Sequence, residues 1–344
     1  MSRTRFALVG CGRIAERHLD ALAQHRDRAE LVAVCDTDPT LLARTAERFG
    51  CAAYAGLDPL LAAGDAEVVI LATPSGLHAP QAIAAAAAGC HVITEKPMAT
   101  RLADGLAMVE AARKHGVRLF VVKQNRYNAP IVQLKQAIDQ GRFGRIFQIT
   151  SNVFWTRPQS YYDQAPWRGT RTLDGGAFMN QASHYVDLLA WLFGPVESVQ
   201  CYTATQARRI EMEDSGVLAL RWASGALGSL NVSMLTYPAN LEGSLTVLGE
   251  RGTVRIGGTA VNAIERWQFA DAQPGDEAIG DSSYATDSVY GFGHVRYYRN
   301  VLDTLAGAGE AEVGGDEGLK SLELLEAAYR AAATGQRVTL PLAP

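Results

Sequence analysis

The stretch GGAFMNQASHYVD, residues 175–187, places polar side chains at helical spacing among apolar neighbours. Asn180, His184 and Asp187 occupy positions i, i+4 and i+7, so an α-helix would carry them on one face. An imidazole titrates near neutral pH and can act as a general base. This face therefore holds either a buried structural histidine or half of an active site, and the rest of the chain must decide between them.

A glycine-rich turn near the start of the chain predicts a dinucleotide site. The sequence GCGRIA lies between an apolar run and a helical pattern and matches G-x-G-x-x-G/A. Gly10 permits a tight turn, Gly12 lets the backbone approach a pyrophosphate, and Ala15 lets the helix pack on the sheet. We expect the start of the helix, with Arg13 and Ile14, to meet the phosphates through its N–H groups.

The second apolar run ends in an acid, Asp36. A carboxylate at this position accepts hydrogen bonds from the ribose hydroxyls and repels a 2′-phosphate. We therefore expect NAD rather than NADP as the cofactor. The alternative is a glycine turn that binds nothing, and the combination of strand, glycines and acid argues against it.

Two further strand ends carry polar residues, and ligands of open α/β sheets bind beyond the carboxyl ends of strands. TPSGLH brings Thr73 and His78 to this edge, where His78 would serve equally well as a helix cap. TEKP brings Glu95 and Lys96 to the same edge. Burial and a nicotinamide cation would lower the pKa of Lys96, so that it could bind a substrate hydroxyl and exchange its proton. The alternative is a solvated surface lysine.

The arrangement of apolar runs predicts two domains. Up to residue 124, uninterrupted Val/Ile/Leu runs alternate with helical patterns, which indicates a Rossmann-type, doubly wound parallel sheet covered by helices. Beyond it, short strands separated by Gly-rich or polar turns leave no room for crossover helices, apart from the helix with His184. We predict an NAD-binding domain over 1–124 and a substrate-binding α+β domain over 125–344 with a large open, mainly antiparallel sheet.

Composition narrows the class of protein. The 344 residues are 48% hydrophobic and 20% charged, which is enough for a sizeable core. A net charge of -4 without any Lys/Arg cluster argues against nucleic-acid binding. Five scattered cysteines without CxxC spacing argue against disulfides or a metal site and favour a reduced, cytoplasmic setting. We expect neither a signal peptide nor a membrane span, because the apolar runs are too short.

An aromatic and cationic loop, RPQSYYDQAPWRGT, precedes the helix with the histidine. Arg157 and Arg168 suit a diphosphate or a carboxylate, because a guanidinium group donates two parallel hydrogen bonds. Tyr161 and Trp167 could pack on a nicotinamide, sugar or uracil ring. The alternative is a lid that packs on its own side chains. Asn125, which follows another strand, also lies at the ligand edge.

Together, GCGRIA, TPSGLH, EKP and the helix with His184, in this order and at these separations, resemble the Gfo/Idh/MocA family of sugar oxidoreductases. The resemblance covers essentially the whole chain. It implies a Rossmann domain that binds NAD(P), and a second domain that binds the sugar and forms oligomers through its sheet, with a homotetramer expected. It also implies that Lys96 and His184 flank the reacting carbon.

The longer runs narrow the resemblance to one branch of that family. KQNRYNAP, NVFWTRPQSYYDQAPWRGT, LDGGAFMNQASHYVDLL and SVYGFGH are similar to UDP-N-acetylglucosaminuronate 3-dehydrogenases of the WlbA/WbpB type. Those enzymes oxidise the C3 hydroxyl of UDP-GlcNAcA on the route to diacetamido uronic acids of bacterial surface polysaccharides such as the O antigen. Some keep NAD bound and recycle it by reducing 2-oxoglutarate, whereas others release NADH. The resemblance implies the reaction and leaves the mode of recycling open.

One position departs from the broad family pattern. Many inositol- and glucose-type members carry an Asp four residues before the histidine, where this chain has Asn180. An amide cannot titrate, but it can hydrogen-bond a substrate in both directions. Proton removal then falls to His184 as general base, while Lys96 holds the hydroxyl and stabilises negative charge on oxygen, although these two roles could be exchanged. Asp187 either orients the imidazole or makes a structural hydrogen bond.

Two other functions compete with this interpretation. The first is another family member that oxidises a free sugar or inositol, and Asn180 in place of an acid and the Arg/aromatic loop argue against it. An NAD-binding sugar sensor without turnover need not keep the pair Lys96 and His184, so their presence favours catalysis. Tyr290 and His294, in SVYGFGH, could approach the site or merely begin a helix, and we leave them out of the catalytic set.

Overall fold

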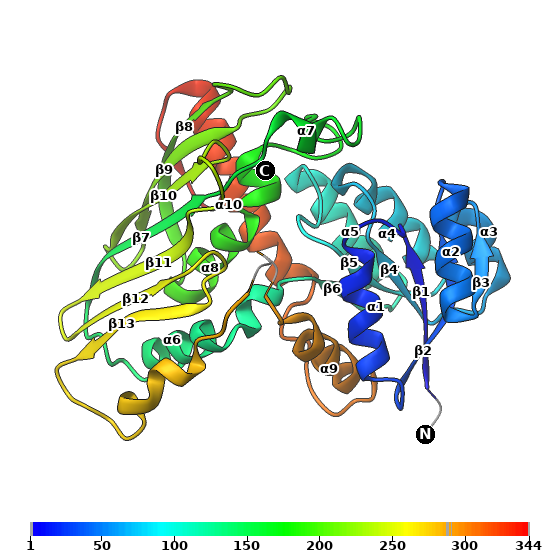
Figure 1. Cartoon of the computed structure of the whole chain (residues 1–344), viewed down its shortest axis with the longest axis horizontal. Coiled ribbons are helices and arrows are strands. Elements are labelled where there is room, and N and C mark those ends of the chain that lie inside the picture. Colours follow the sequence, from blue (N-terminus) through cyan, green and yellow to red (C-terminus); the bar gives the residue numbers. More distant parts are fainter. Residues whose placement is uncertain (1–2, 287–288, 290, 343–344) are drawn as a thin grey trace. The chain divides into compact units, whose positions relative to one another are not determined.

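Figure 1 shows the computed structural model, which describes residues 3–286, 289 and 291–342. Contacts between residues divide the chain into two compact units. These are Met1–Lys123 with His294–Leu322, called unit 1, and Gln124–Gly293 with Glu323–Pro344, called unit 2. A segment near the C-terminus thus completes the unit that begins the chain. The assignment of separate roles to two domains remains a prediction.

Unit 1 is built on a six-stranded parallel sheet in the order β3-β2-β1-β4-β5-β6. Its strands are β1 (Thr4–Val9), β2 (Ala29–Cys35), β3 (Ala52–Tyr54), β4 (Val68–Leu71), β5 (His91–Thr94) and β6 (Leu119–Val121). Phe6, Leu8 and Ile70 are fully buried, as expected for strands covered on both faces. The predicted doubly wound sheet is confirmed. Strand β3 was not predicted, because its short sequence AAY carries no apolar run.

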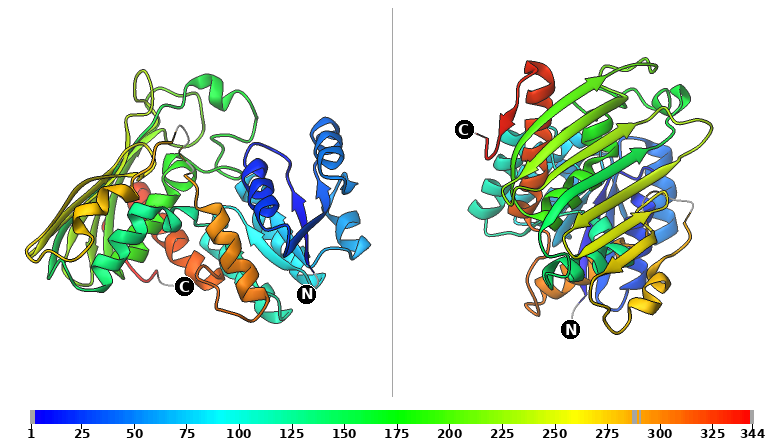
Figure 2. Two further views of the ribbon diagram at one scale, coloured as in Figure 1. Left: turned by 60° about the horizontal axis from the view of Figure 1, so that its bottom comes forward. Right: turned by 90° about the vertical axis from the view of Figure 1, so that its left-hand side faces the viewer.

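The helices of unit 1 include one, α2, whose two ends are set by capping residues in the sequence. They are α1 (Ala15–Gln24), α2 (Pro39–Phe49), α3 (Leu57–Ala63), η1 (Ser75–Leu77), α4 (His78–Ala87), α5 (Leu102–Lys114) and α9 (His294–Leu305). In α2, the Asp38 side chain accepts hydrogen bonds from the first-turn N–H groups of Thr40 and Leu41, and Gly50 ends the helix in the left-handed conformation. Helix α9 contacts α1, although the two are far apart in sequence (Figure 2).

Unit 2 is built on an eight-stranded sheet in the order β13-β12-β11-β7-β10-β9-β8-β14. Its strands are β7 (Ile146–Phe154), β8 (Val196–Ala204), β9 (Ser215–Trp222), β10 (Leu227–Ser233), β11 (Glu242–Gly249), β12 (Gly252–Gly257), β13 (Ala263–Phe269) and β14 (Val338–Thr339). Only the pair β7 and β10 is parallel among these neighbours. The predicted large, mainly antiparallel sheet is confirmed.

One face of this second sheet, seen directly in the right-hand view of Figure 2, is exposed. Tyr202 and Val217 lie directly opposite each other on β8 and β9 and expose 72% and 48% of their surface. Leu227, on β10, exposes 51%. Apolar side chains of this size on an open sheet face are typical of a surface that another protein surface covers.

The remaining helices belong to unit 2 or pass into it. They are η2 (Gln124–Tyr127), α6 (Ala129–Asp139), α7 (Gln159–Tyr162), η3 (Ala177–Gln181), α8 (Ser183–Phe193), η4 (Asp276–Ser282) and α10 (Gly315–Thr334). Helix α10 begins in unit 1 and ends in unit 2. A search of the described residues finds no helix whose length and apolar character would suit it to span a bilayer.

Candidate active site

The glycine turn after β1 has the geometry that a dinucleotide site requires. Gly10 has φ of +95°, and a Cβ on it would lie 2.6 Å from the Ala72 carbonyl oxygen, so only glycine fits without strain. A Cβ on Gly12 would meet nothing within 4 Å, which leaves open space beside the backbone there. Arg13 is exposed and Ile14 half-buried in the same turn, just before α1. These features fit a bound pyrophosphate at the start of a helix.

Asp36 is held at this turn by the backbone. Its Oδ2 accepts a hydrogen bond of 2.6 Å from the N–H of Cys11, and its Oδ1 accepts one of 2.8 Å from the N–H of Asp38. The side chain is half-buried. The acid that follows β2 is therefore fixed next to the glycine turn, where a carboxylate can accept from ribose hydroxyls. This placement fits NAD.

His78 and Thr73 lie at the end of β4, but their side chains make contacts within the protein. Nδ1 of His78 lies 2.9 Å from the carbonyl oxygen of Pro97, and Nε2 lies 2.9 Å from that of Thr73. Burial lowers the pKa of this imidazole, and the two carbonyl acceptors oppose the effect. The hydroxyl of Thr73 donates to Gln81 over 2.6 Å. These contacts favour a role for His78 in joining the loops after β4 and β5.

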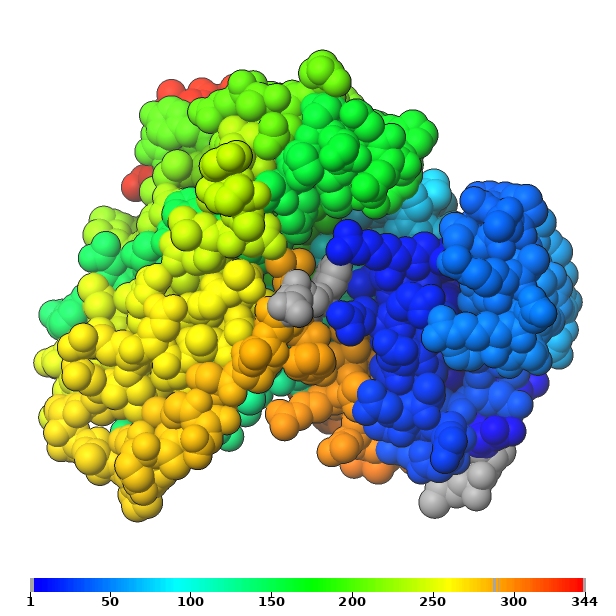
Figure 3. All heavy atoms as spheres, viewed as in Figure 1, coloured from blue at the N-terminus to red at the C-terminus, as the bar shows by residue number. Residues whose placement is uncertain are grey.

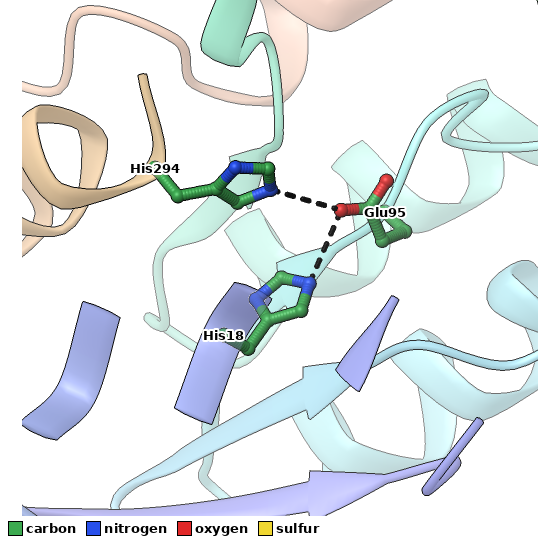
Figure 4. A group of neighbouring side chains, drawn as sticks. All are labelled: His18, Glu95 and His294. Carbon is green, nitrogen blue, oxygen red and sulfur yellow. Dashed lines mark hydrogen bonds and ion pairs between the residues drawn. The ribbon is translucent and has the colours of Figure 1, made fainter. Parts of the chain in front are cut away.

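Lys96 follows β5 and is half-buried. Its backbone N–H donates to Oε2 of Glu95 over 3.0 Å. Glu95 is 5% exposed, and its Oε1 lies 3.1 Å from Nε2 of His18 and 3.7 Å from Nε2 of His294 (Figure 4). Burial alone would raise the pKa of Glu95, but the hydrogen bonds and charges of the two histidines outweigh it and hold that pKa well below its usual range. The carboxylate of Glu95 therefore faces these histidines, a contact that the sequence did not predict.

In unit 2, His184 is buried on α8, and its contact with Gln124 was not predicted from the sequence. Nε2 of His184 lies 3.0 Å from the side-chain nitrogen of Gln124, at the start of η2. The amide nitrogen of Gln124 can only donate, so Nε2 of His184 faces a donor in this structure. Gln124 directly follows the strand run VVK, and this position at a strand end was the available signal. Asn125 is buried beside it.

Asp187, on α8, makes a buried ion pair with Arg126. Its two oxygens accept from Nε and Nη2 of Arg126, each over 2.7 Å. The guanidinium carbon of Arg126 also lies 4.9 Å from the centre of the Trp191 ring. Both carboxylate oxygens thus bind a guanidinium group. This supports the structural role for Asp187 and shows how α8 is joined to η2.

The expected single helical face is wrong for Asn180. Residues Ala177–Gln181 form a π-helical turn, and α8 begins only at Ser183, so Asn180 lies outside the helix that carries His184. The Asn180 amide instead donates to a carboxylate oxygen of Asp174. An irregular turn of this kind commonly marks a functional site.

A buried acid holds the π-helical turn in place. Glu213 accepts from the N–H of Phe178 over 2.9 Å and from the hydroxyl of Tyr329 over 2.8 Å. A Cβ on Gly176 would lie 1.9 Å from an oxygen of Glu213, so this acid requires glycine at position 176. The partners come from distant parts of the chain, which is why helical spacing alone misplaced Asn180.

The Arg/aromatic loop packs on its own side chains in this structure, and Figure 3 shows this part of the chain in green at the surface of unit 2. The guanidinium group of Arg168 lies 4.1 Å from the centre of the Tyr161 ring and donates to the Tyr161 carbonyl. The same guanidinium carbon lies 5.4 Å from the centre of the Trp167 ring. Arg157 donates to Gln181 over 3.0 Å. Stacked guanidinium groups keep donors available at their edges, so the loop can still bind an anion.

Two family models match the chain. The NAD-binding Rossmann fold of the Gfo/Idh/MocA oxidoreductase family matches residues 4–123, and the C-terminal alpha/beta domain of the same family matches residues 135–340. A curated relative, D-apiose dehydrogenase of Paraburkholderia graminis, is 28% identical over 99% of this chain and 90% of its own length.

Two solved structures are much more similar. The WlbA dehydrogenase from Bordetella pertussis, in complex with NADH and UDP-GlcNAcA, is 61% identical with a TM-score of 0.97, over 99% of both chains. The corresponding protein from Chromobacterium violaceum, in complex with the same two ligands, is 60% identical with a TM-score of 0.96, over 99% of this chain and 97% of that one.

Proposed function

This chain belongs to the Gfo/Idh/MocA oxidoreductase family, and we propose that it oxidises the C3 hydroxyl of UDP-GlcNAcA to the 3-keto sugar, with NAD as cofactor. The observation that carries the proposal is the 61% identity, over 99% of the chain, to a dehydrogenase whose structure holds NADH and UDP-GlcNAcA. Lys96 and His184 are the residues that would perform the proton chemistry.

The residues of unit 1 fit NAD. We assign the pyrophosphate to the turn of Gly10, Gly12, Arg13 and Ile14, and the ribose to Asp36. When bound, NAD supplies the hydride acceptor, at C4 of its nicotinamide ring. The carboxylate of Asp36 already accepts two backbone N–H bonds, which hold it beside the glycine turn.

His184 is assigned as the general base. Its Nε2 faces the amide nitrogen of Gln124, a donor, so we assign this nitrogen as the atom that would take the proton of the 3-hydroxyl. The substrate hydroxyl would replace the Gln124 amide as donor. Lys96 would donate to the same oxygen and stabilise the negative charge that develops on it. Asn180 takes no part in the proton transfer, because an amide cannot titrate.

Recognition of the nucleotide sugar is assigned to the Arg/aromatic loop. Arg157 and Arg168 would bind the diphosphate or the sugar carboxylate, since guanidinium groups donate parallel hydrogen bonds to both. Tyr161 and Trp167 would pack on a ring of the substrate or cofactor. Asn180, held by Asp174, would bind a sugar hydroxyl or the acetamido group.

Several finer assignments belong to the same proposal. The exposed apolar face with Tyr202, Val217 and Leu227 supports a homo-oligomer, for which we propose a tetramer. Five cysteines without disulfide bonds support a cytoplasmic location. We place the reaction in the synthesis of diacetamido uronic acids for bacterial surface polysaccharides, with 2-oxoglutarate as a candidate oxidant of the bound NADH.

The test is to mix the purified protein with UDP-GlcNAcA and NAD⁺, with and without 2-oxoglutarate, and to follow NADH absorbance and the mass of the nucleotide sugar. We expect a sugar product lighter by two hydrogen atoms. NADH that accumulates without the keto acid indicates an exchangeable cofactor, and product only with the keto acid indicates recycling. An unchanged sugar in both mixtures would contradict the proposal and favour another sugar or a sensor.

A further inference from the structure

A buried cluster in unit 1 takes no part in the proposed chemistry, yet it ends at the proposed catalytic lysine. His18 on α1, Glu95 after β5 and His294 at the start of α9 point toward one another (Figure 4). They are 0%, 5% and 3% exposed. The hydroxyl of Tyr298, one turn along α9, lies 2.7 Å from Nδ1 of His18. Three elements that are far apart in sequence therefore meet at one carboxylate.

The polar contacts of this cluster form a connected chain. Nδ1 of His18 lies 2.7 Å from the hydroxyl of Tyr298, and Nε2 of His18 donates to Oε1 of Glu95 over 3.1 Å. The other carboxylate oxygen, Oε2, accepts the backbone N–H of Lys96 over 3.0 Å. The chain of bonds thus runs from α9 through α1 to the peptide group of Lys96.

The cluster keeps a charge in a place where burial opposes it. Burial alone would raise the pKa of Glu95, but the hydrogen bonds and charges of His18 and His294 lower it well below its usual range. The titratable and charged groups around this carboxylate are His18 and Arg17 on α1, His294 and Tyr298 on α9, His78 on α4, and Lys96 itself. A buried anion is retained at a cost unless it is well hydrogen-bonded, so its geometry is strongly specified.

We propose that Glu95 is a positioning residue for Lys96: held by His18 and His294 on one oxygen, it fixes the Lys96 backbone N–H with the other. The direction in which the lysine side chain leaves the end of β5 then depends on this carboxylate. The inference rests on the proposed function in one respect, namely that Lys96 is catalytic. A misplacement of about 1 Å in a catalytic group can cost about 100-fold in rate, so support of this kind is consequential.

Two histidines and a glutamate are also a ligand set that zinc uses. A metal in this place would have to displace the proton between His18 and Glu95, because a protonated nitrogen cannot bind a metal. Nε2 of His294 lies 3.7 Å from Oε1 of Glu95, which is longer than a hydrogen bond. We treat a metal as an outcome that the test must exclude.

The test compares Glu95→Gln with a matched control, His25→Asn. In the Gln variant one oxygen becomes an NH₂ donor, which faces either the His18 N–H or the Lys96 N–H. In the control, loss of the bond between Nε2 of His25 and the carbonyl oxygen of Val295, over 2.9 Å, loosens the same helices α1 and α9 without touching Glu95. Both variants weaken the packing of these helices, so a merely structural role would affect them alike.

Two readouts separate positioning from stability. We expect Glu95→Gln to lower kcat with UDP-GlcNAcA by about 100-fold, with KM for NAD changed much less, and His25→Asn to keep the wild-type kcat. The second readout needs no sugar: the rate at which a small acylating reagent modifies the Lys96 amine in NAD-free protein, followed by peptide mass. This rate changes in Glu95→Gln and not in the control. Should Glu95→Gln fail to fold, His294→Asn serves instead, with an expected loss in kcat of at most about tenfold, because its contact with Glu95, at 3.7 Å, is longer than a hydrogen bond.

A folded Glu95→Gln protein with wild-type kcat and wild-type lysine reactivity overturns the proposal. So does one equivalent of a transition metal in the purified wild-type protein, by elemental analysis, whose removal with a chelator abolishes activity. If the wild-type protein leaves UDP-GlcNAcA unchanged, the proposed function fails, and the lysine reactivity of the two variants still decides whether Glu95 positions Lys96.

Discussion

The two units hold their candidate catalytic residues by different means. Lys96 follows directly from a short buried strand, and the glycine turn and Asp36 that belong to the same unit also follow strands of that sheet. His184 is carried by a helix that begins after an irregular turn, and this helix is joined to the start of its unit by the ion pair of Arg126 and Asp187. Unit 1 thus brings its candidate residues together by sheet topology, with Lys96 further fixed by the contact with Glu95, whereas unit 2 relies on specific buried polar contacts.

This difference decides what the sequence could predict. Gly10, Asp36 and Lys96 were predictable, because the carboxyl ends of parallel strands meet at one edge and the glycine motif is local. Asn180 was misplaced, because the π-helical turn depends on Glu213, which lies on another segment. The network at Glu95 was missed for the same reason, since its partners come from α1 and α9. Spacing within one element does not report contacts between distant elements.

The largest effect that we expect comes from the histidine of unit 2. His184→Ala should lower kcat by about 10²- to 10⁴-fold, the usual contribution of a general base, and should leave NADH binding to unit 1 intact. Steady-state kinetics would measure the loss in kcat, and a fluorescence titration would measure the affinity for NADH. An enzyme that keeps its kcat without the imidazole would exclude His184 as the base and leave Lys96 in that role.

The ion pair of Arg126 and Asp187 in unit 2 should make a large contribution to the free energy of unfolding. Arg126→Ala leaves the buried carboxylate of Asp187 without its guanidinium group and should lower the free energy of unfolding by about 3–5 kcal/mol. Arg171→Ala is the control, because its pair with Glu211 is exposed and should matter by about 0–1 kcal/mol. Urea unfolding of both variants would compare them. Equal losses would mean that α8 is not held by this pair.

In unit 1 the glycine turn allows a sharper comparison. Gly10→Ala forces a Cβ into the Ala72 carbonyl at a positive φ and should cost about 1–3 kcal/mol of stability. Gly12→Ala meets open space, so the protein should unfold at the wild-type temperature and yet bind NADH more weakly. Thermal unfolding with and without NADH distinguishes the two. Unchanged NADH affinity in Gly12→Ala would argue against a pyrophosphate at this turn.

The smallest effect is a pH dependence from Glu95. Its pKa in the folded protein lies well below the value of about 4.3 in the unfolded chain, so its contribution to stability is complete above that value and is lost as the pH falls below it. Urea unfolding of the wild type and of Glu95→Gln at several pH values isolates this contribution. The wild type should lose its advantage on acidification, and a difference between the two proteins that is constant with pH would contradict the assignment of a buried anion.

The central claim is that a hydride leaves C3 of the sugar for NAD, and UDP-GlcNAcA carrying deuterium at C3 tests it most directly. The reduced cofactor, isolated after turnover without 2-oxoglutarate or after a single turnover, should carry the deuterium, as mass spectrometry would show. A reduced cofactor that contains only hydrogen, formed while the labelled sugar is consumed, would contradict oxidation at C3.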